Sequence, residues 1–242
     1  MLRIKQISKH FGGIKALDSC TLEIEKGEIT AIIGPNGSGK STLFNIISQL
    51  IDEDFGTINL GKELISDKID FQVAKGGISR TFQEVRLFKN MTIKEHLEIA
   101  LSEKDENLIE SLFKKEESYE DRIKEILSFV KLNKSLDTLA TDLSYGQRKL
   151  LDLAVAIAKP HKVLLLDEPV AGINPELRKE IKKVLLGLNK KGETILLIEH
   201  DMNFVMDIAD YVYVLDEGRV IAQGKPKEIQ NNKKVLEAYL GE

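Results

Sequence analysis

The segment GPNGSGKST, from Gly34 to Thr42, limits the possible fold of this chain more than any other stretch. It follows the apolar run ITAII (29–33) and leads into TLFNIISQL, where apolar residues recur at helical spacing. Glycines allow the backbone to wrap closely around a bound group, and N–H groups at the start of a helix attract anions. The pattern therefore predicts a strand, a phosphate-binding loop and a helix in direct succession.

The residue types of this loop also predict how it binds a nucleoside triphosphate. We expect Lys40 to reach the β- and γ-phosphates and the hydroxyl of Ser41 to bind Mg²⁺. Backbone N–H groups of the loop would surround the phosphates. The residues expected to bind the nucleotide here are Gly34, Pro35, Asn36, Gly37, Ser38, Gly39, Lys40, Ser41 and Thr42.

A second apolar run, VLLLDEP (163–169), ends in two acidic residues. Ligands of open α/β sheets bind at the carboxyl ends of the strands, so both carboxylates are expected at the binding edge. Asp167 is predicted to hold Mg²⁺, and Glu168 is a candidate general base for the water that attacks the γ-phosphate. Together with the loop, these acids indicate a P-loop hydrolase, and at this point kinases and GTPases remain open.

Strand-like and helix-like segments alternate through much of the chain, which predicts an α/β fold with a doubly wound P-loop NTPase (RecA-like) core. The second and third strand candidates are almost wholly apolar, as is typical of parallel strands buried on both faces. The predicted strands are Ile29–Ile33, Val163–Leu166, Thr194–Ile198 and Tyr211–Leu215, and the predicted helices are Gly39–Leu50, Gln147–Ala158 and Pro175–Asn189. Residues 2–8, 21–25 and 56–64 instead show the alternation of an antiparallel β subdomain.

Residues 92–140 depart from this alternation, because they are rich in Glu, Lys, Leu and Ile and contain no glycine or proline. Thr92 and Glu95 have the spacing of a helix capping box, and Ser118 and Asp121 have the related Ser-x-x-acid spacing. The region predicts an inserted α-helical subdomain. We therefore expect one domain over 1–242, with a core of 1–83 and 144–242 and a helical subdomain of about 84–143.

Composition argues against several kinds of protein. Lys and Arg number 35 against 39 Asp and Glu, a formal net charge of −4 that disfavours a nonspecific nucleic-acid binder. The single cysteine, Cys20, cannot form an internal disulfide, is expected to be buried and fits a reducing compartment. The longest apolar runs are far shorter than the ~20 residues that span a bilayer, and the first residues lack the apolar region of a secretory signal. We expect no membrane crossing.

The segment DLSYGQRKLLDL (142–153) predicts a second anion site, because Ser144 and Gln147 have capping-box spacing and an exposed helix N-terminus attracts anions. LSYGQ resembles the signature motif of ATP-binding cassette (ABC) ATPases, whose usual form is LSGGQ. The chain carries the family's other motifs in the family's order: KHFGG with Phe11, RTFQE with Gln83, AGINP at 171–175 and LLIEHD with His200. The resemblance covers essentially the whole chain.

The resemblance implies that two chains share each ATP site. His200 would sense the γ-phosphate, Gln83 would contact Mg²⁺ and the attacking water, and Phe11 would stack on adenine. The residues of one chain that would close over the partner's γ-phosphate are Ser144, Gly146 and Gln147.

Two positions depart from the family pattern. Tyr145 stands where glycine is commonest, and its ring is expected to pack against either the partner or the helical subdomain. Asn174 replaces the acidic residue that is frequent in its loop, yet before Pro175 it has the character of a helix N-cap.

Longer segments are similar to the larger of the two ATPase types of branched-chain amino-acid (Leu/Ile/Val) importers, although the stretch between Arg86 and Asp142 is shorter than usual there. These segments are GISRTFQEVRLFKNMT (77–92), DEPVAGINP (167–175) and the region from LLIEHD to the closing NNKKVLEAYLGE (231–242). The resemblance implies ATP and Mg²⁺ as cofactors and a cytoplasmic protein peripheral on the inner face of the cell membrane. The implied partners are a second ABC ATPase subunit, the same or related, transmembrane permease subunits and, indirectly, a substrate-binding protein, with no nucleic acid.

Other functions remain open at this point. Amide or urea importers and lipopolysaccharide-export ATPases share much of the same C-terminal region. A soluble ABC ATPase of chromosome maintenance or translation is disfavoured, because the chain has neither a long heptad coiled coil nor a second cassette. A small-molecule kinase is disfavoured by the signature segment and His200.

Overall fold

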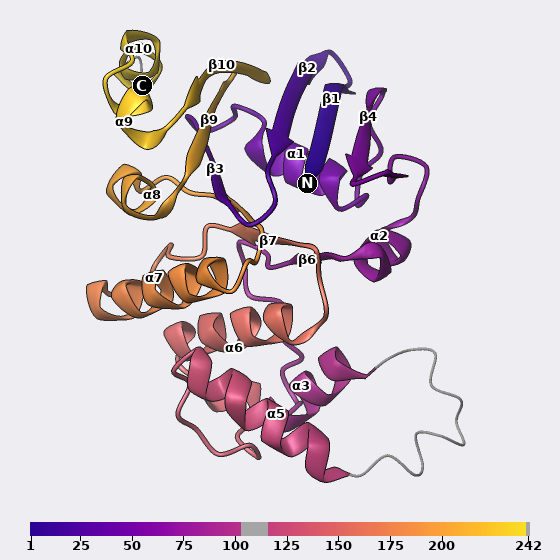
Figure 1. Ribbon diagram of the computed structural model, residues 1–242, viewed down its shortest axis with the longest axis vertical. Helices are drawn as coiled ribbons and strands as arrows, with labels where there is room; N and C mark the ends of the chain where they lie inside the picture. Colours follow the sequence, from indigo (N-terminus) through magenta and orange to yellow (C-terminus); the bar gives the residue numbers. More distant parts are fainter. Residues whose placement is uncertain (103–115, 241–242) are drawn as a thin grey trace. The chain divides into compact units, whose positions relative to one another are not determined.

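The computed structural model describes residues 1–102 and 116–240 of the 242-residue chain (Figure 1). The chain forms two compact units. We call residues 1–80, 161–171 and 185–242 the sheet unit, and residues 81–160 and 172–184 the helical unit. Among the described residues, no helix has both the length and the apolar character needed to cross a membrane.

A six-stranded sheet dominates the sheet unit, in the order β10-β9-β3-β8-β7-β6. All of its neighbouring strands are parallel except β10, which pairs antiparallel with β9. Its strands are β3 (Ile29–Ile33), β6 (Ile78–Arg80), β7 (Val163–Asp167), β8 (Ile195–Ile198), β9 (Tyr211–Asp216) and β10 (Arg219–Gly224). β3, β7 and β8 are buried along their whole length, which explains why they are apolar except for Thr30 in β3 and Asp167 at the end of β7, and confirms the α/β prediction.

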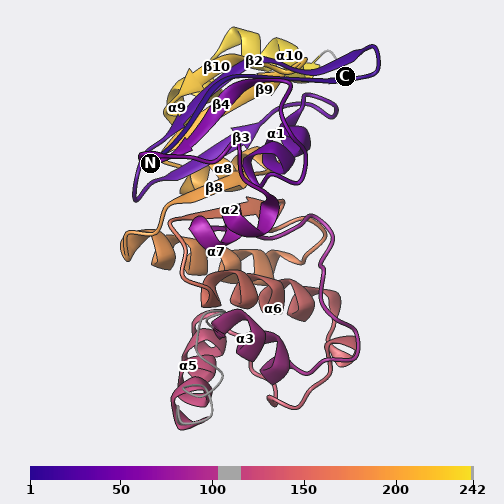
Figure 2. The same cartoon turned by 90° about the vertical axis from the view of Figure 1, so that its right-hand side faces the viewer.

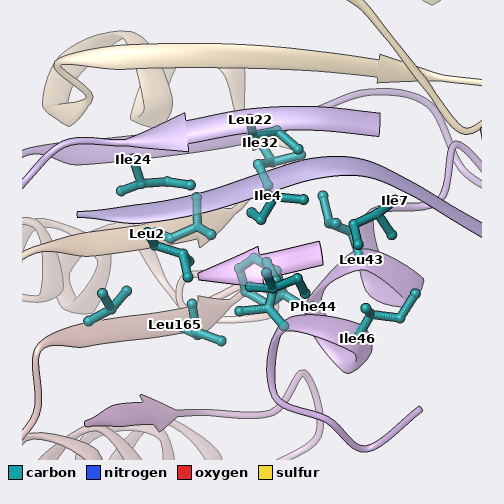
Figure 3. Close-up of a cluster of buried hydrophobic side chains, with 14 of the residues drawn as sticks. Leu2, Ile4, Ile7, Leu22, Ile24, Ile32, Leu43, Phe44, Ile46 and Leu165 are labelled. Carbon is teal, nitrogen blue, oxygen red and sulfur yellow. The ribbon is translucent and has the colours of Figure 1, made fainter. Parts of the chain in front are cut away.

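The same unit contains a second, antiparallel sheet in the order β2-β1-β4-β5, which confirms the predicted β subdomain. Its strands are β1 (Leu2–Phe11), β2 (Ile14–Ile24), β4 (Phe55–Leu60) and β5 (Glu63–Leu64), and the helices of the unit are α1 (Lys40–Ile47), α2 (Asp70–Gly76), α8 (Met202–Ile208), α9 (Pro226–Gln230) and α10 (Lys233–Leu240). Side chains of both sheets and of α1 form one hydrophobic core around Phe44 (Figure 3). Cys20 lies in this core, as expected, and burial raises the pKa of its thiol to about 12.

Helix α1 ends earlier than the predicted Leu50. The hydroxyl of Ser48 donates to the carbonyl oxygen of Phe44 at 2.8 Å, and Gln49 has a φ of 53°, in the left-handed region. A left-handed residue stops an α-helix because it cannot continue the right-handed backbone.

Helices make up the other unit, and Figure 2 shows α6 running beside α3 and α5, with which it is in contact. These elements are α3 (Ile93–Leu101), α5 (Glu116–Phe129), the short 3₁₀ helix η1 (Ala140–Asp142) and α6 (Tyr145–Ala158), while α7 (Pro175–Lys190) begins in this unit and ends in the sheet unit. Through these contacts α6 groups with the helical unit, whereas the sequence suggested 144–242 as part of the core.

The capping predictions for this unit have different outcomes. Thr92 caps α3. Its hydroxyl oxygen accepts from the Glu95 N–H at 3.2 Å, and the Glu95 carboxylate accepts from the Thr92 N–H at 2.7 Å. α5 already includes Glu116, so this helix does not begin at Ser118. The side chain of Ser118 lies outside the described residues, and with it the predicted contact to Asp121.

Candidate functional site

The loop after β3 lies at the carboxyl edge of the parallel sheet, next to the ends of β7 and β8. Registers that pair Ile32 with Ile198 and Ile198 with Asp167 set these three strand ends side by side. Glycine is required where the loop passes the neighbouring strand β9. Gly34 has a φ of 149°, and a Cβ there would lie 1.9 Å from the carbonyl oxygen of Leu215. The loop can therefore pass this strand only with a bare backbone.

Lys40, the first residue of α1, turns its side chain back into the loop. Its Nζ donates to the carbonyl oxygens of Gly34 at 2.7 Å and Pro35 at 2.8 Å, and to Ser38 Oγ at 3.3 Å. Only 6% of Lys40 is exposed, so this charge is held inside the curve of the loop. An anion bound by the loop would meet this ammonium group together with the N–H groups of the α1 start.

Asp167, at the end of β7, is buried and bonds to an arginine that the sequence analysis did not single out. Arg80 Nη2 donates to Asp167 Oδ2 at 3.1 Å, and Nη1 donates to Asn45 Oδ1 on α1 at 2.9 Å and to Ser48 Oγ, just after α1, at 2.7 Å. Arg80 thus links the helix after the phosphate loop to the carboxylate predicted to hold Mg²⁺. The available signal was a charged residue inside the otherwise buried strand β6.

Glu168 and His200 are 32 positions apart in the sequence and meet in the structure. His200 Nε2 lies 2.6 Å from Glu168 Oε1. Glu168 has a φ of 47°, and its N–H donates to the carbonyl oxygen of Ile198 at 3.0 Å. A positive φ is uncommon outside glycine, and such strain is concentrated at functional sites. The predicted base and the predicted γ-phosphate sensor therefore form one pair at the sheet edge.

A second carboxylate behind this pair was also missed by the sequence analysis. Glu199 Oε1 accepts from the Val170 N–H at 2.9 Å, and its Oε2 accepts from the His200 N–H at 3.2 Å. Burial raises the pKa of Glu199, while backbone N–H groups of Val170, His200 and Asp201 act in the opposite direction. No pattern in the sequence distinguishes this residue from the other acids at strand ends.

In the helical unit, Ser144 caps α6 as predicted. Its Oγ accepts from the Gln147 N–H at 3.3 Å, and Gln147 Oε1 accepts from the Ser144 N–H at 3.0 Å. A groove of about 500 Å³ opens beside this cap, with the exposed Ser144 on its wall. Its lining also includes Tyr145, Gly146, Gln147, Gly172, Asn174 and Glu176. Asn174 Oδ1 accepts from the Leu177 N–H at 2.8 Å, so it caps α7 as predicted.

Tyr145, left without a role by the motif, lies over the loop that precedes α7 in its own chain. A Cβ on Gly172 would meet Tyr145 Cε1 at 3.3 Å, and Gly172 has a φ of 71°. On its other side, Lys149 Nζ lies 6.0 Å from the centroid of the Tyr145 ring and donates to the carbonyl oxygen of Gln83 at 3.3 Å. Within the helical unit, α6 thus contacts both the segment of Gln83 and the loop at Gly172.

Two predicted ligands are exposed. Gln83 belongs to the helical unit and is exposed. Its backbone carbonyl oxygen accepts a hydrogen bond from Lys149 Nζ. Phe11, at the end of β1, is 45% exposed, with Lys9 Nζ 5.7 Å from its ring centroid. An exposed ring at a strand end has a free face for stacking, and the adenine role of Phe11 stays a prediction.

Comparison with known proteins gives this geometry a context. The model of the family described as "ABC transporter" matches residues 17–171. The chain belongs to the ABC transporter family. A second model, described as "Branched-chain amino acid ATP-binding cassette transporter", matches residues 219–242 of this ABC chain. One relative is the probable branched-chain amino acid transport ATP-binding protein LivG of Archaeoglobus fulgidus, 40% identical over 245 residues that cover 100% of the chain and 95% of the relative.

Solved ABC cassettes have the same fold. A cassette in its ADP conformation is 39% identical with a TM-score of 0.86, and the match covers 100% of this chain and 99% of that one. A bacterial cassette solved as a dimer is 28% identical with a TM-score of 0.84, covering 93% and 99% respectively. The ABC chain is therefore a nucleotide-binding ATPase, and its loop at 34–42 has the sequence pattern of a P-loop.

Proposed function

We propose that this ABC chain is the ATP-hydrolysing subunit of an importer for branched-chain amino acids. The observation that carries the proposal is the C-terminal match at 219–242 to the model of branched-chain amino acid cassettes. The relative named LivG, aligned over the whole chain, agrees with it. Amide or urea import is the alternative that the experiment below separates.

In the proposed mechanism, the P-loop and the Lys40 ammonium hold the phosphates of ATP, and Phe11 stacks on the adenine. The Ser41 hydroxyl, the Asp167 carboxylate and the Gln83 amide oxygen would hold Mg²⁺. All three are hard oxygen donors, the ligands that Mg²⁺ prefers, and Ser41 and Gln83 are exposed. Mg²⁺ would neutralise charge on the β- and γ-phosphates.

The Glu168–His200 pair acts on the attacking water and the γ-phosphate. Glu168 Oε1 is held at 2.6 Å from His200 Nε2, which orients the carboxylate. Glu168 accepts the proton of the water while the water oxygen bonds to the γ-phosphorus and the bond to the β-phosphate oxygen breaks. His200 and Lys40 stabilise the negative charge on the γ-phosphate oxygens.

The site is completed by a second ABC ATPase subunit. Ser144, Gly146 and Gln147 of one chain close over the γ-phosphate held by the P-loop of the other. The capped and exposed start of α6 supports this arrangement, because its backbone N–H groups favour an anion. ATP then joins the two chains, and hydrolysis releases them. At the inner face of the membrane, the helical unit passes this motion to the transmembrane permease. A substrate-binding protein delivers the amino acid.

Uptake of radiolabelled leucine into proteoliposomes tests the proposal. The vesicles contain permease subunits that co-purify with this chain, with the ABC chain and ATP on one side and the binding protein on the other. We expect ATP-dependent uptake of leucine, competition by isoleucine and valine, and no uptake with Glu168→Gln. Competition by urea or short amides in place of these amino acids would support the amide or urea alternative and overturn the substrate assignment.

A further inference from the structure

Glu199 is a buried carboxylate to which the proposed mechanism gives no task. It directly follows β8, and only 2% of the residue is exposed. Both of its oxygens are used, and each accepts an N–H from a different segment: Val170 at 2.9 Å and His200 at 3.2 Å. A buried charge is costly unless it is hydrogen bonded, so these contacts are what allow a carboxylate at this position.

Both N–H groups belong to the segments that carry the Glu168–His200 pair. Val170 lies two residues after Glu168, in a turn closed by the Ala171 N–H donating to the Glu168 carbonyl oxygen at 3.2 Å. His200 carries the second N–H on its own backbone. The positive φ of Glu168, 47°, is a conformation that persists only where surrounding contacts enforce it. Glu199 thus bonds to the backbone of His200 and to the backbone of Val170, two residues after Glu168.

We propose that Glu199 is a positioning residue that sets Glu168 and His200 at their contact distance for hydrolysis of ATP. This inference rests on the proposed function, in which that pair acts on the water and the γ-phosphate. The chemistry requires an ionised carboxyl group. A carboxylate accepts at both oxygens, whereas a glutamine side chain accepts at one atom and presents N–H donors at the other. Glutamine would therefore set a donor against a donor at one of the two segments.

Steady-state ATP hydrolysis by Glu199→Gln is the main test, with Ile198→Val as the matched control. Ile198 is the neighbouring residue on β8, 1% exposed, and the control removes one methylene from the same strand without touching either N–H. Rates are expressed per nucleotide-binding site, counted with a fluorescent ATP analogue. We expect Glu199→Gln to lower kcat by about 10- to 100-fold, as misplaced catalytic groups do, and to leave the KM for ATP within about twofold. Ile198→Val keeps kcat within about twofold of the wild type.

Amide hydrogen exchange provides a readout that does not depend on activity. In Glu199→Gln the Val170 amide should exchange faster than in the wild type, while the amides of β7 keep their protection. Glu199→Asp retains two acceptor oxygens on a shorter side chain, and we expect it to recover part of the lost kcat. Where Glu199→Gln does not fold, the kcat of Glu199→Asp and the exchange rate of its Val170 amide decide the question.

The results separate this inference from the proposed function. Wild-type kcat and unchanged Val170 exchange in Glu199→Gln would overturn the positioning role, as would equal losses in Glu199→Gln and Ile198→Val. Absence of ATP hydrolysis in the wild-type chain assembled with its partners would instead overturn the proposed function. A wild type that hydrolyses ATP, together with a selective loss of kcat in Glu199→Gln, supports both.

Discussion

At the scale of single residues, Glu168 combines a close side-chain contact with a constrained backbone. Its carboxylate contacts His200 at 2.6 Å, and its backbone is held at a φ of 47°. Glu168→Gln keeps the shape of the side chain but removes the basic oxygen, so we expect ATP binding to persist while hydrolysis stops and an ATP-bound dimer accumulates. Size-exclusion chromatography with and without ATP, alongside a phosphate-release assay, checks this. Hydrolysis by the variant at the wild-type rate would contradict the role of Glu168.

Residue roles could be predicted where a motif ties a side chain to one task. The strand–loop–helix pattern singled out Lys40. The acidic pair at a strand end singled out Asp167 only in combination with that loop, since such a pair alone often marks the start of a loop. Arg80 and Glu199 could not be found in this way. Their importance lies in bonds to segments far away in the sequence, such as Arg80 to Asp167, 87 positions on. Only the folded chain shows those partners.

At the scale of elements, the start of α6 carries the signature segment and gives a sharp test. Ser144→Arg removes the acceptor of the Gln147 N–H and places a bulky cation over the helix start. We expect it to abolish hydrolysis while the nucleotide affinity of the monomer stays nearly unchanged. Thr92→Ala is the control, because it removes the equivalent cap of α3 and costs about 1 kcal/mol of stability without affecting hydrolysis. A large loss of monomer affinity in Ser144→Arg would mean that Ser144 serves the phosphate of its own chain.

A second prediction for α6 concerns pH. Burial raises the pKa of Asp152 to about 7, and the nearby Lys149 acts against this rise. The folded pKa thus lies above the unfolded value of about 3.9, so the contribution of Asp152 to stability is full below that value and is lost as pH rises through 7. Asp152→Asn stays neutral. We expect the free energy of unfolding of the variant, relative to that of the wild type, to increase by about 1–4 kcal/mol as pH rises from 5 to 8.

Urea unfolding at these two pH values measures the Asp152 effect. Glu125→Gln, an exposed substitution on α5, is the control and should change little with pH. A difference between Asp152→Asn and the wild type that is constant with pH, or that falls toward pH 8, would contradict the prediction.

Element types could be predicted from periodicity, and element ends could not. β3 occupies the predicted Ile29–Ile33 because a strand buried on both faces is almost wholly apolar and its limits are therefore clear in the sequence. α1 stops at Ile47 because Gln49 adopts a left-handed backbone. A glutamine in the sequence does not predict this conformation. The Tyr145–Gly172 contact depends on how the loop before α7 returns to α6, a matter of tertiary packing.

At the scale of the whole molecule, the sequence predicted an α/β core, an antiparallel β subdomain and an inserted α-helical subdomain, and the structure has all three. The division of the chain is where contacts add information. α6 follows the predicted helical insertion in sequence, yet it packs on α3 and α5 and so belongs to the helical unit. The two halves of the proposed ATP site accordingly lie in different units, with the P-loop in one and the signature segment in the other.

The proposed sharing of sites between two chains can be tested by mixing two inactive variants. Lys40→Ala damages the P-loop but retains Ser144, and Ser144→Arg retains the P-loop. Each variant alone has two damaged sites in every dimer. A mixed dimer pairs the intact P-loop of one chain with the intact signature segment of the other, so one of its two sites works.

An equal mixture should therefore recover about a quarter of the wild-type ATPase rate, because about half of randomly formed dimers are mixed and each has one working site. Mixed dimers are counted by pull-down of chains with two different tags. The control mixes Lys40→Ala with a chain carrying both substitutions, which leaves no intact pair and should recover no activity. If mixed dimers form and the first mixture stays inactive, Ser144 and the P-loop must act within one chain, and the sharing of sites is wrong. Recovery in proportion to mixed dimers is the result that only sites built from two chains can produce.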